Sequence, residues 1–372
     1  MTYYDVAIVG AGPAGLQAAH TLRNITNMSI MIIDANPLDY EKPCGGGLPI
    51  DCLKDFPYLE QAIKHKTTKI RAQYKNISRE FPVVINMCPR KDMRKLQFSM
   101  ISSDDRITIT LCQRIDHVHI PNKAIYLSNG QHINYKWLIG ADGVNSIVAK
   151  AIHFSTAKVP IVLSHLRSLT NNYPDEHISD IIFLDDVLGY FWIFPKGDHV
   201  NVGMGGHIKG KELRKRFETK LNTLIHNSYD EFYPSYYSRI YDSAHLIPFD
   251  YTPGPHYDKD NNIILCGDAA SFVNQMTGEG IWFALTSGKE AAEVIAGTRN
   301  FADYPSFAHY LERVQALKDD IRNLPTGETF DQIFCGEESN DTVKFLFSHS
   351  IPQPRPLTDE EKKNIYDRLG GA

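Results

Sequence analysis

The first fifty residues contain two short apolar runs separated by a glycine loop and an amphipathic stretch. Residues 5–9 form the first run, residues 16–24 have the apolar spacing of a helix, and residues 29–34 form the second run. Continuous apolar runs are typical of parallel strands that are buried on both faces, and a period of about 3.6 residues is typical of a helix. The pattern therefore predicts a strand–helix–strand unit at the N-terminus.

The rest of the chain mixes helical patterns with short strands. The predicted elements are a two-stranded antiparallel unit at 68–87, a helix from about residue 90, short strands resembling a β-meander at 106–140, aromatic-rich strands at 160–206, an amphipathic helix at about 209–226, a buried strand entering a turn at 262–270, and helices at about 279–297 and 303–323.

These patterns interleave, which determines the predicted domain organisation. We expect an α/β domain with a parallel sheet, assembled from residues 1–67, 88–155 and 256–325, because its signals occur in three separate stretches. An antiparallel, β-rich domain made of residues 68–87 and 156–255 would be inserted into it. Residues 326–372 would form a helical or irregular C-terminal tail.

Composition excludes several classes of protein. The formal net charge is −5, which argues against a nucleic-acid partner. No run of 18 apolar residues and no basic leader occurs, so we expect a cytoplasmic location. The six cysteines and 15 histidines form no pattern of metal ligands, so we expect no metal site.

A glycine-rich loop, Gly10-x-Gly12-x-x-Gly15, joins the first predicted strand and helix. Gly10 would allow a tight turn, Gly12 would let backbone N–H groups approach a pyrophosphate, and Gly15 would let helix and strand pack closely. Asp34 ends the second strand, where a carboxylate would bind ribose hydroxyls. This combination predicts a dinucleotide site, and the motif alone leaves both FAD and NAD(P) open.

Two further turns follow buried strands. Asp142 and Gly143 form one, and Gly267 and Asp268 form the other, where the aspartate could bind a ribityl chain or simply cap a helix. After the second turn, Gly278 and Gly280 precede a long helix whose N-terminus could stabilise negative charge.

The stretch KPCGGGLP at 42–49 places Cys44 beside three consecutive glycines. Glycine loses more conformational freedom on folding than any other residue, so three in a row indicate close approach of another group to the backbone. Downstream, Tyr190, Trp192 and Phe194 alternate along a strand that Pro195 ends, so they would share one face. That face could be an ordinary core or the wall of a cavity.

These motifs together resemble the geranylgeranyl reductase family, in the para-hydroxybenzoate hydroxylase branch of the glutathione-reductase-like flavoproteins. The resemblance rests on GxGxxG, PCGGG, the two turns and the stretch YFWIFPKGDHVNVG. It implies a Rossmann-type FAD domain with an inserted substrate sheet. The implied FAD contacts are Gly10, Gly12, Pro13, Ala14, Gly15, Asp34, Ala35, Cys44, Gly45, Gly46, Arg90, Asp142, Gly143, Gly267, Asp268, Gly278, Gly280 and Ile281.

The resemblance also implies an activity: reduction of isolated carbon–carbon double bonds by hydride transfer from reduced FAD, with NAD(P)H or another donor as the reductant. Cys44, Gly46, Tyr190 and Trp192 would take part in catalysis, with Cys44 as a candidate proton donor or simply a space-filling residue. Tyr190, Trp192, Phe194 and Pro195 would contact a hydrophobic, prenyl-type substrate, which is compatible with peripheral membrane contact. The oligomeric state stays open.

Other functions share this pattern. A monooxygenase, hydroxylase or tailoring dehydrogenase would use the same fold, and a non-catalytic flavoprotein would bind FAD without turnover. A flavin-dependent halogenase is disfavoured because Tyr190 replaces the first tryptophan of the halogenase motif, and because halogenases are expected to be longer.

Overall fold

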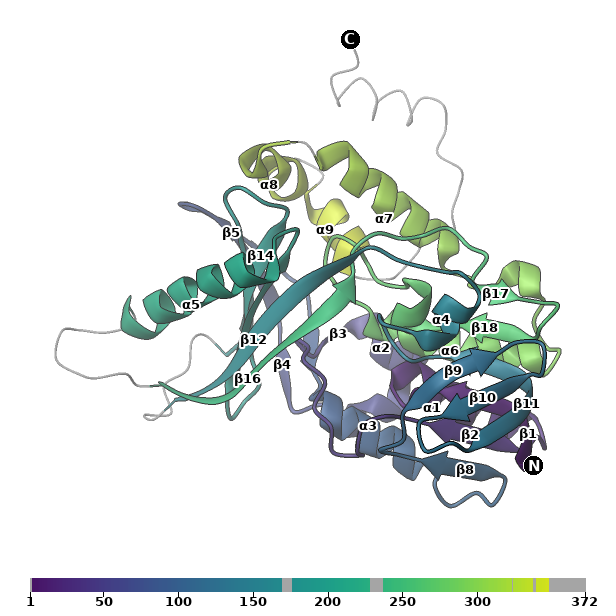
Figure 1. Cartoon of the computed structure of the whole chain (residues 1–372). Coiled ribbons are helices and arrows are strands. Elements are labelled where there is room, and N and C mark those ends of the chain that lie inside the picture. The colour runs from purple at the N-terminus through teal and green to yellow at the C-terminus, as the bar shows by residue number, and fades with distance from the viewer. Residues whose placement is uncertain (1, 169–175, 228–236, 323, 337–338, 348–372) are drawn as a thin grey trace, which may run out of the picture.

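Two large β-sheets, of eight and seven strands, and a small three-stranded sheet organise the described part of the chain (Figure 1). The computed structural model describes residues 2–168, 176–227, 237–322, 324–336 and 339–347.

The eight-stranded sheet contains the N-terminal strand–helix–strand unit. Its strands are β1 (Thr2–Val9), β2 (Ile30–Ile33), β8 (Ile107–Thr110), β9 (Ile115–His119), β10 (Ala124–Leu127), β11 (His132–Gly140), β17 (Tyr257–Asp258) and β18 (Ile263–Leu265). The order β18-β11-β1-β2-β8 is parallel throughout, and β17 joins β18 antiparallel. The β-meander predicted at 106–140 is wrong in part, because β8 pairs with β2 and only β9, β10 and β11 form antiparallel neighbours.

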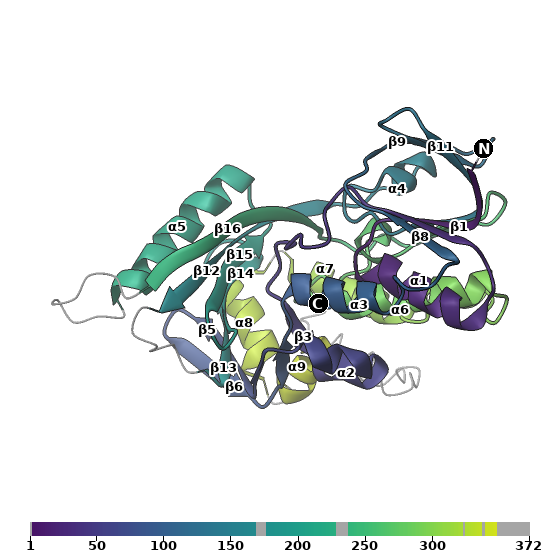
Figure 2. The same cartoon turned by 90° about the horizontal axis from the view of Figure 1, so that it is seen from below.

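Helices α1 (Pro13–Ile25), α3 (Arg90–Ser99) and α6 (Ile281–Ile295) lie side by side against one face of this sheet (Figure 2). Helix α1 begins at a proline, which has no N–H to leave unpaired in the first turn. A Cβ on Gly288 of α6 would lie 2.2 Å from the carbonyl oxygen of Ala14, so only glycine allows the two helices to approach this closely.

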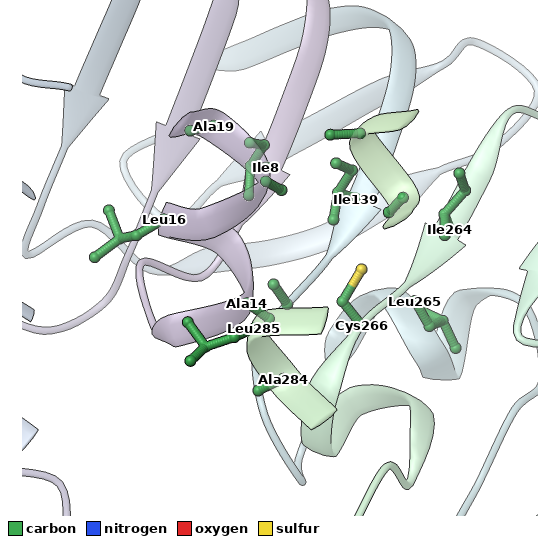
Figure 3. Close-up of a cluster of buried hydrophobic side chains, with 14 of the residues drawn as sticks. Ile8, Ala14, Leu16, Ala19, Ile139, Ile264, Leu265, Cys266, Ala284 and Leu285 are labelled. Carbon is green, nitrogen blue, oxygen red and sulfur yellow. The ribbon is translucent and has the colours of Figure 1, made fainter. Parts of the chain in front are cut away.

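The hydrophobic core around the eight-stranded sheet lies between its parallel strands and helices α1 and α6 (Figure 3). Ile8, Ile139 and Ile264 come from adjacent strands β1, β11 and β18, and they belong to the same buried cluster as Leu16 of α1 and Leu285 of α6. All five side chains are fully buried. The strands are continuous apolar runs because helices or loops cover both of their faces.

The seven-stranded sheet is the inserted one. Its strands, in spatial order, are β16 (Tyr237–Pro248), β12 (Lys158–Ser168), β15 (Val200–Gly206), β14 (Gly189–Pro195), β13 (Ile178–Phe183), β5 (Lys69–Tyr74) and β6 (Ile77–Phe81). All neighbours are antiparallel except β13 and β5. Phe191 of β14 packs against Phe217 of α5 (Gly210–Asn227), which leaves Tyr190 and Trp192 on the opposite face.

Smaller elements join the two large sheets. The third sheet orders β3 (Gly47–Pro49), β7 (Ile85–Met87) and β4 (His65–Thr67). The remaining helices are α2 (Ile50–Asp55), α4 (Ile147–Ala151), α7 (Ala308–Ile321), α8 (Thr326–Phe334) and α9 (Ser339–Phe347), with 3₁₀ turns at Pro57–Ala62, Gly267–Ala270 and Phe301–Asp303.

The start of the predicted C-terminal tail is packed rather than loose. Phe330 and Phe334 of α8 and Leu346 of α9 form a cluster with Tyr74 and Phe81 of the inserted sheet. Residues 348–372 lie outside the described part. The predicted fold class is confirmed: an α/β domain, an inserted antiparallel sheet and C-terminal helices. The domain boundaries given above remain our proposal.

The contact between Trp192 and Gly203 gives a test of the inserted sheet. A Cβ on Gly203 would lie 2.0 Å from Cζ2 of Trp192, which is on the neighbouring strand. We expect Gly203→Ala to lower the free energy of unfolding by about 1–3 kcal/mol, the usual cost of overpacking. Urea unfolding followed by tryptophan fluorescence measures this change.

The matched control is Gly210→Ala at the exposed start of α5, where a new Cβ meets only Pro160 at 4.0 Å. This variant should be as stable as the parent chain. Equal stability of the Gly203 and Gly210 variants would contradict the packing described for Trp192.

Candidate active site

A cavity of about 440 Å³ opens between the carboxyl ends of β1 and β2 and the face of the inserted sheet; we call it the main cavity. Almost every residue predicted to form the site lines it. These residues are Gly10, Gly12, Pro13, Ala14, Asp34, Ala35, Cys44, Gly45, Gly46, Arg90, Asp142, Gly143, Tyr190, Trp192, Phe194, Gly267, Asp268, Gly278, Gly280 and Ile281. Gly15 and Pro195 are not among the lining residues.

The three motif glycines of the first loop have different surroundings. Gly10 has a φ of +104°, and a Cβ there would lie 2.2 Å from the carbonyl oxygen of Ala141. A Cβ on Gly15 would lie 1.9 Å from the carbonyl oxygen of Gly10, so Gly15 serves packing. A Cβ on Gly12 would meet nothing within 4 Å, which means that its backbone faces the open cavity.

The carboxylate of Asp34, just after β2, is hydrogen-bonded to the loop that carries Gly10 and Gly12. It accepts hydrogen bonds from the backbone N–H groups of Ala11 at 2.6 Å and Asn36 at 2.7 Å. Arg94 of α3 lies 3.5 Å from Asp34 Oδ1, and its buried Nε has no hydrogen-bond partner in the described part of the chain. A guanidinium group at a cavity wall suits a ligand that carries phosphate or hydroxyl oxygens.

The turn of Asp142 and Gly143 contacts the cavity through its backbone. The Asp142 carboxylate points to α4 instead, where it accepts hydrogen bonds from the Ser146 hydroxyl and from the Ile147 N–H at 2.6 Å. Burial raises the pKa of Asp142, while these hydrogen bonds lower it by less. A Cβ on Gly143 would meet nothing within 4 Å, so Gly143 leaves the same kind of open cradle as Gly12.

Asp268 forms an ion pair that connects two distant motifs. Its Oδ2 lies 2.8 Å from Nζ of Lys42, which precedes the PCGGG stretch. Burial acts to raise the pKa of Asp268, but the charge and hydrogen bond of Lys42, together with the charge of Arg90, outweigh it, and the pKa is lowered. Burial, together with Lys42, lowers the pKa of the neighbouring His245 to about 4, so this imidazole is neutral at pH 7. At pH 7 the Asp268 carboxylate is therefore ionised and the His245 imidazole is neutral.

The main cavity fits a bound dinucleotide. The open backbone at Gly12 and Gly143 leaves room that side chains would fill, and the N-terminus of α1 adds its positive partial charge. The spare Nε of Arg94 and the carboxylate of Asp34 lie at the same end. We expect these residues to hold the adenosine and pyrophosphate parts of FAD.

The stretch from Glu41 to Gly46, which we call the glycine loop, is held by its carbonyl oxygens. Each of four carbonyl oxygens accepts one hydrogen bond. Glu41 accepts from Tyr241 Oη at 3.2 Å, Cys44 from Asn201 Nδ2 at 3.1 Å, Gly45 from Lys196 Nζ, and Gly46 from the N–H of Cys88 at 2.8 Å. Gly46 has a φ of +63°, and a Cβ there would lie 2.8 Å from the Cys88 carbonyl oxygen. Three of these donors come from the inserted sheet, which therefore fixes the loop.

Lys196 is unusual because its ammonium group is buried. It follows Pro195, is 4% exposed, and also contacts Sδ of Met87 at 3.4 Å. Desolvation lowers the pKa of Lys196 to about 8. The sequence analysis missed this residue, although it stands inside the quoted FPKGD motif. It also missed Lys42, Asn201 and His245 as site residues.

The aromatic residues of β14 form one wall of the cavity. The Tyr190 hydroxyl donates to the carbonyl oxygen of Thr277, and Trp192 Nε1 donates to Asn201 Oδ1 at 2.7 Å. The ring of Phe194 lies 3.0 Å from the Cβ position of Gly45. The polar atoms of Tyr190 and Trp192 are thus used within the protein, and their apolar surfaces face the cavity.

In the described residues, no group of three or more His, Cys, Asp or Glu side chains could hold a metal ion. None of the helices there combines the length and apolar character that a bilayer crossing requires.

Several known proteins are similar to this chain in sequence. Residues 4–168 match the pyridine nucleotide-disulphide oxidoreductase family. The geranylgeranyl diphosphate reductase of Nicotiana tabacum is 28% identical over 337 residues, which cover 83% of this chain and 70% of that protein. The digeranylgeranylglycerophospholipid reductase of Methanococcus vannielii is 25% identical over 330 residues, covering 81% and 79%.

Solved structures share the fold. A geranylgeranyl bacteriochlorophyll reductase-like protein from Thermoplasma acidophilum has a TM-score of 0.75 at 19% identity, over 99% of this chain and 100% of that chain. A flavin-dependent brominase has a TM-score of 0.73 at 16% identity, over 99% and 100%. The length argument against a halogenase does not hold for this brominase, which spans the same fold from end to end.

The matches confirm two predictions. The chain resembles the geranylgeranyl reductases, and it is an FAD-dependent oxidoreductase. The roles of individual residues remain our proposal.

Gly12 and Gly15 offer a paired test of the cofactor site. The backbone of Gly12 is extended, with a φ of −84°, so Gly12→Val should fold normally but place its side chain in the cavity. We expect it to weaken FAD binding by about a hundredfold, or about 2.7 kcal/mol. Equilibrium dialysis against FAD measures this loss.

Gly15→Val should behave in the opposite way, because its clash is with backbone and not with ligand. We expect it to lower the unfolding free energy or prevent folding. A Gly12→Val protein that retains full flavin content would refute the proposed cradle.

The buried Lys196 predicts a dependence of stability on pH. Its folded-state pKa of about 8 lies below the unfolded value of 10.5, so the folded state binds the proton less tightly. The contribution of Lys196 to stability is therefore lowest below pH 8 and rises between pH 8 and 10.5. From pH 7 to pH 10 the parent chain should gain about 2–3 kcal/mol relative to Lys196→Met.

Chemical unfolding at several pH values measures this difference. Lys209→Met, at an exposed position, is the control and should show no such trend. A flat difference between the parent and Lys196→Met would mean that Lys196 is solvated.

Proposed function

We propose that this protein reduces isolated carbon–carbon double bonds of an apolar, prenyl-type substrate. Reduced FAD, when bound, supplies the hydride. The observation that carries the proposal is a second, apolar cavity that continues from the main one. The two relatives described above are reductases named for geranylgeranyl-containing molecules, which supports the same class of substrate.

The second cavity, which we call the distal cavity, has a volume of about 80 Å³. The residues that line both cavities are Ile161, Ile181, Tyr190, Trp192, Ile247, Thr277, Gly278, Leu346 and Phe347. Beyond them the distal cavity reaches Ile333 and Phe334 of α8. An apolar path therefore runs from the glycine loop, past the aromatic wall, to the C-terminal helices.

This arrangement would orient an alkene and exclude water. A flexible isoprenoid chain that fills an apolar path loses its freedom on binding, so that a double bond is held beside the glycine loop. Fixed walls matter here, because the hydrogen bonds of Trp192 and Tyr190 leave their rings little freedom to move. An unactivated alkene has no polar group to guide it, so shape must do so.

The proposal also requires an acid that protonates the second alkene carbon. Cys44 Sγ accepts the N–H of Gly46 at 3.3 Å, which leaves the thiol proton for donation. Tyr190 is a weaker candidate, because its proton is already directed to Thr277 and burial raises its pKa. We propose Cys44 as the proton donor and Tyr190, Trp192 and Phe194 as substrate contacts.

We propose NAD(P)H or another electron donor as the reductant. The sequence contains no second GxGxxG motif after a strand, so a donor would bind transiently.

An anaerobic single turnover tests the proposal. The FAD-loaded protein is photoreduced without oxygen and mixed with geranylgeraniol, and mass spectrometry follows the product. We expect the gain of two hydrogen atoms for each double bond reduced. Cys44→Ser should keep its FAD and reduce the alkene at least about tenfold more slowly, a barrier increase of about 1.4 kcal/mol.

Product that forms only after oxygen is admitted would overturn the proposal and support a monooxygenase. Reduced flavin that never reacts under either condition would support a non-catalytic flavoprotein.

A further inference from the structure

The residues that line both cavities come from three parts of the chain, and we call this set of residues the junction. Ile161, Ile181, Tyr190, Trp192 and Ile247 belong to the inserted sheet, Thr277 and Gly278 belong to the turn before α6, and Leu346 and Phe347 are the last two residues of α9. An apolar chain that passes from the main cavity into the distal cavity must therefore pass the C-terminal end of α9.

The sheet and the turn approach each other closely at the junction. The Tyr190 hydroxyl donates to the carbonyl oxygen of Thr277. A Cβ on Gly278 would lie 3.5 Å from Tyr190 Oη and 3.7 Å from Cδ1 of Ile247, which are ordinary contact distances. This part of the junction is therefore closed and held in place.

Helix α9 is attached to the same turn. The buried amide of Asn274 donates to the Leu346 carbonyl oxygen at 3.1 Å and to Tyr310 Oη at 2.8 Å, and the Tyr310 hydroxyl donates to the Phe345 carbonyl oxygen at 3.0 Å. These carbonyl groups lie in the last turn of α9, where the helix has no N–H to offer them. The Asn274 side chain also accepts two backbone N–H groups of its own turn, at 3.0 Å each. One amide thus holds the turn and the end of α9 together.

Phe347 has a different environment from the other large side chains of the junction. Tyr190 and Trp192 are held by hydrogen bonds, and Leu346 is 2% exposed. The ring of Phe347 is only partly buried, and it packs against both the cluster that contains Ile181 and the cluster of the C-terminal helices. Its ring therefore lies at the boundary of the two cavities and has no polar atom.

The volumes of the two cavities show why this boundary matters. The main cavity has about 440 Å³ and the distal cavity about 80 Å³, so only a short segment of a chain fits beyond the junction. Truncating a large side chain in a packed region leaves a cavity, because the surroundings relax only in part. Truncation of Phe347 would enlarge the space beyond the aromatic wall and leave the glycine loop unchanged.

We propose that Phe347 is a specificity-determining residue that limits the length of the apolar chain the site accepts. The preferred substrate would be one whose chain, beyond the double bond at the glycine loop, is short enough to end in the distal cavity. This inference rests on the proposed function in one respect: it assumes that an apolar chain runs through both cavities.

A binding experiment on the oxidised, FAD-loaded protein tests this inference without turnover. The probes are farnesol and geranylgeraniol, which differ by one five-carbon prenyl unit. Quenching of tryptophan fluorescence gives both dissociation constants, for the parent chain and for Phe347→Ala. Comparing the ratio of the two constants between the parent and the variant cancels the difference in how well water solvates the two alcohols.

We expect Phe347→Ala to raise the ratio of the farnesol constant to the geranylgeraniol constant about fivefold or more, because the enlarged space can bury the additional prenyl unit. Phe347→Leu, which keeps an apolar side chain at this position, should shift the ratio in the same direction by a smaller factor.

Phe345→Ala is the matched control. It also removes a phenyl ring from α9, but this ring contacts Tyr310 and lines neither cavity. It should leave the ratio unchanged.

An unchanged or lower ratio in Phe347→Ala, with FAD content retained, would overturn the inference and mean that the ring serves packing alone. If the alanine variant does not retain FAD, the leucine variant decides by the same criterion. An equal shift in Phe345→Ala would also overturn the inference, because it would show a general loosening of α9.

The two proposals fail separately. A shifted ratio without alkene reduction would leave the limit on chain length standing, and alkene reduction with an unshifted ratio would remove only that limit.

Discussion

The attachment of the glycine loop to the inserted sheet is the constraint on which the site depends. Three consecutive glycines have no side chains to pack, so their position must come from hydrogen bonds to the backbone. Asn201, Lys196 and Tyr241 of the inserted sheet supply these bonds, and Cys88 supplies a fourth. Without them the loop would have to satisfy its carbonyl groups in water, and the wall shared by the cofactor and substrate regions would be lost.

This attachment also explains why a charged group is buried where a neutral one would be cheaper. The Lys196 ammonium is desolvated, yet it donates a hydrogen bond to the Gly45 carbonyl oxygen, which no backbone N–H of the described residues contacts. Lys42 has a similar role, because it connects the start of the loop to Asp268, which follows β18 of the eight-stranded sheet. Lys42 and Lys196 hold opposite ends of the glycine loop. The position of the loop therefore depends on both the eight-stranded and the seven-stranded sheet.

Local motifs were the predictable part of this protein. The turn at Gly10 and the close packing at Gly15 followed from the sequence, because each depends on a strand and helix that adjoin it. The pairs Lys42–Asp268 and Lys196–Gly45 are 226 and 151 residues apart, and no local pattern links their members. The error at β8 has the same cause. Nothing in the sequence of a short alternating strand shows whether it pairs with a parallel partner, here β2, or with an antiparallel neighbour.

The distribution of charge determines how a substrate can lie in this site. The main cavity is bordered by Lys42, Arg90, Arg94, Asp34 and Asp268, whereas the described lining of the distal cavity holds no charge. Moving an unpaired ion from water into such a region costs far more than an apolar chain gains by filling it. A substrate with an anionic head must therefore keep that head out of the distal cavity, and only its neutral end can pass the aromatic wall. Exclusion of charge from the distal cavity needs no contact with the head group. Under the proposed function, the fold could therefore accept different head groups while an alkene lies beside the glycine loop.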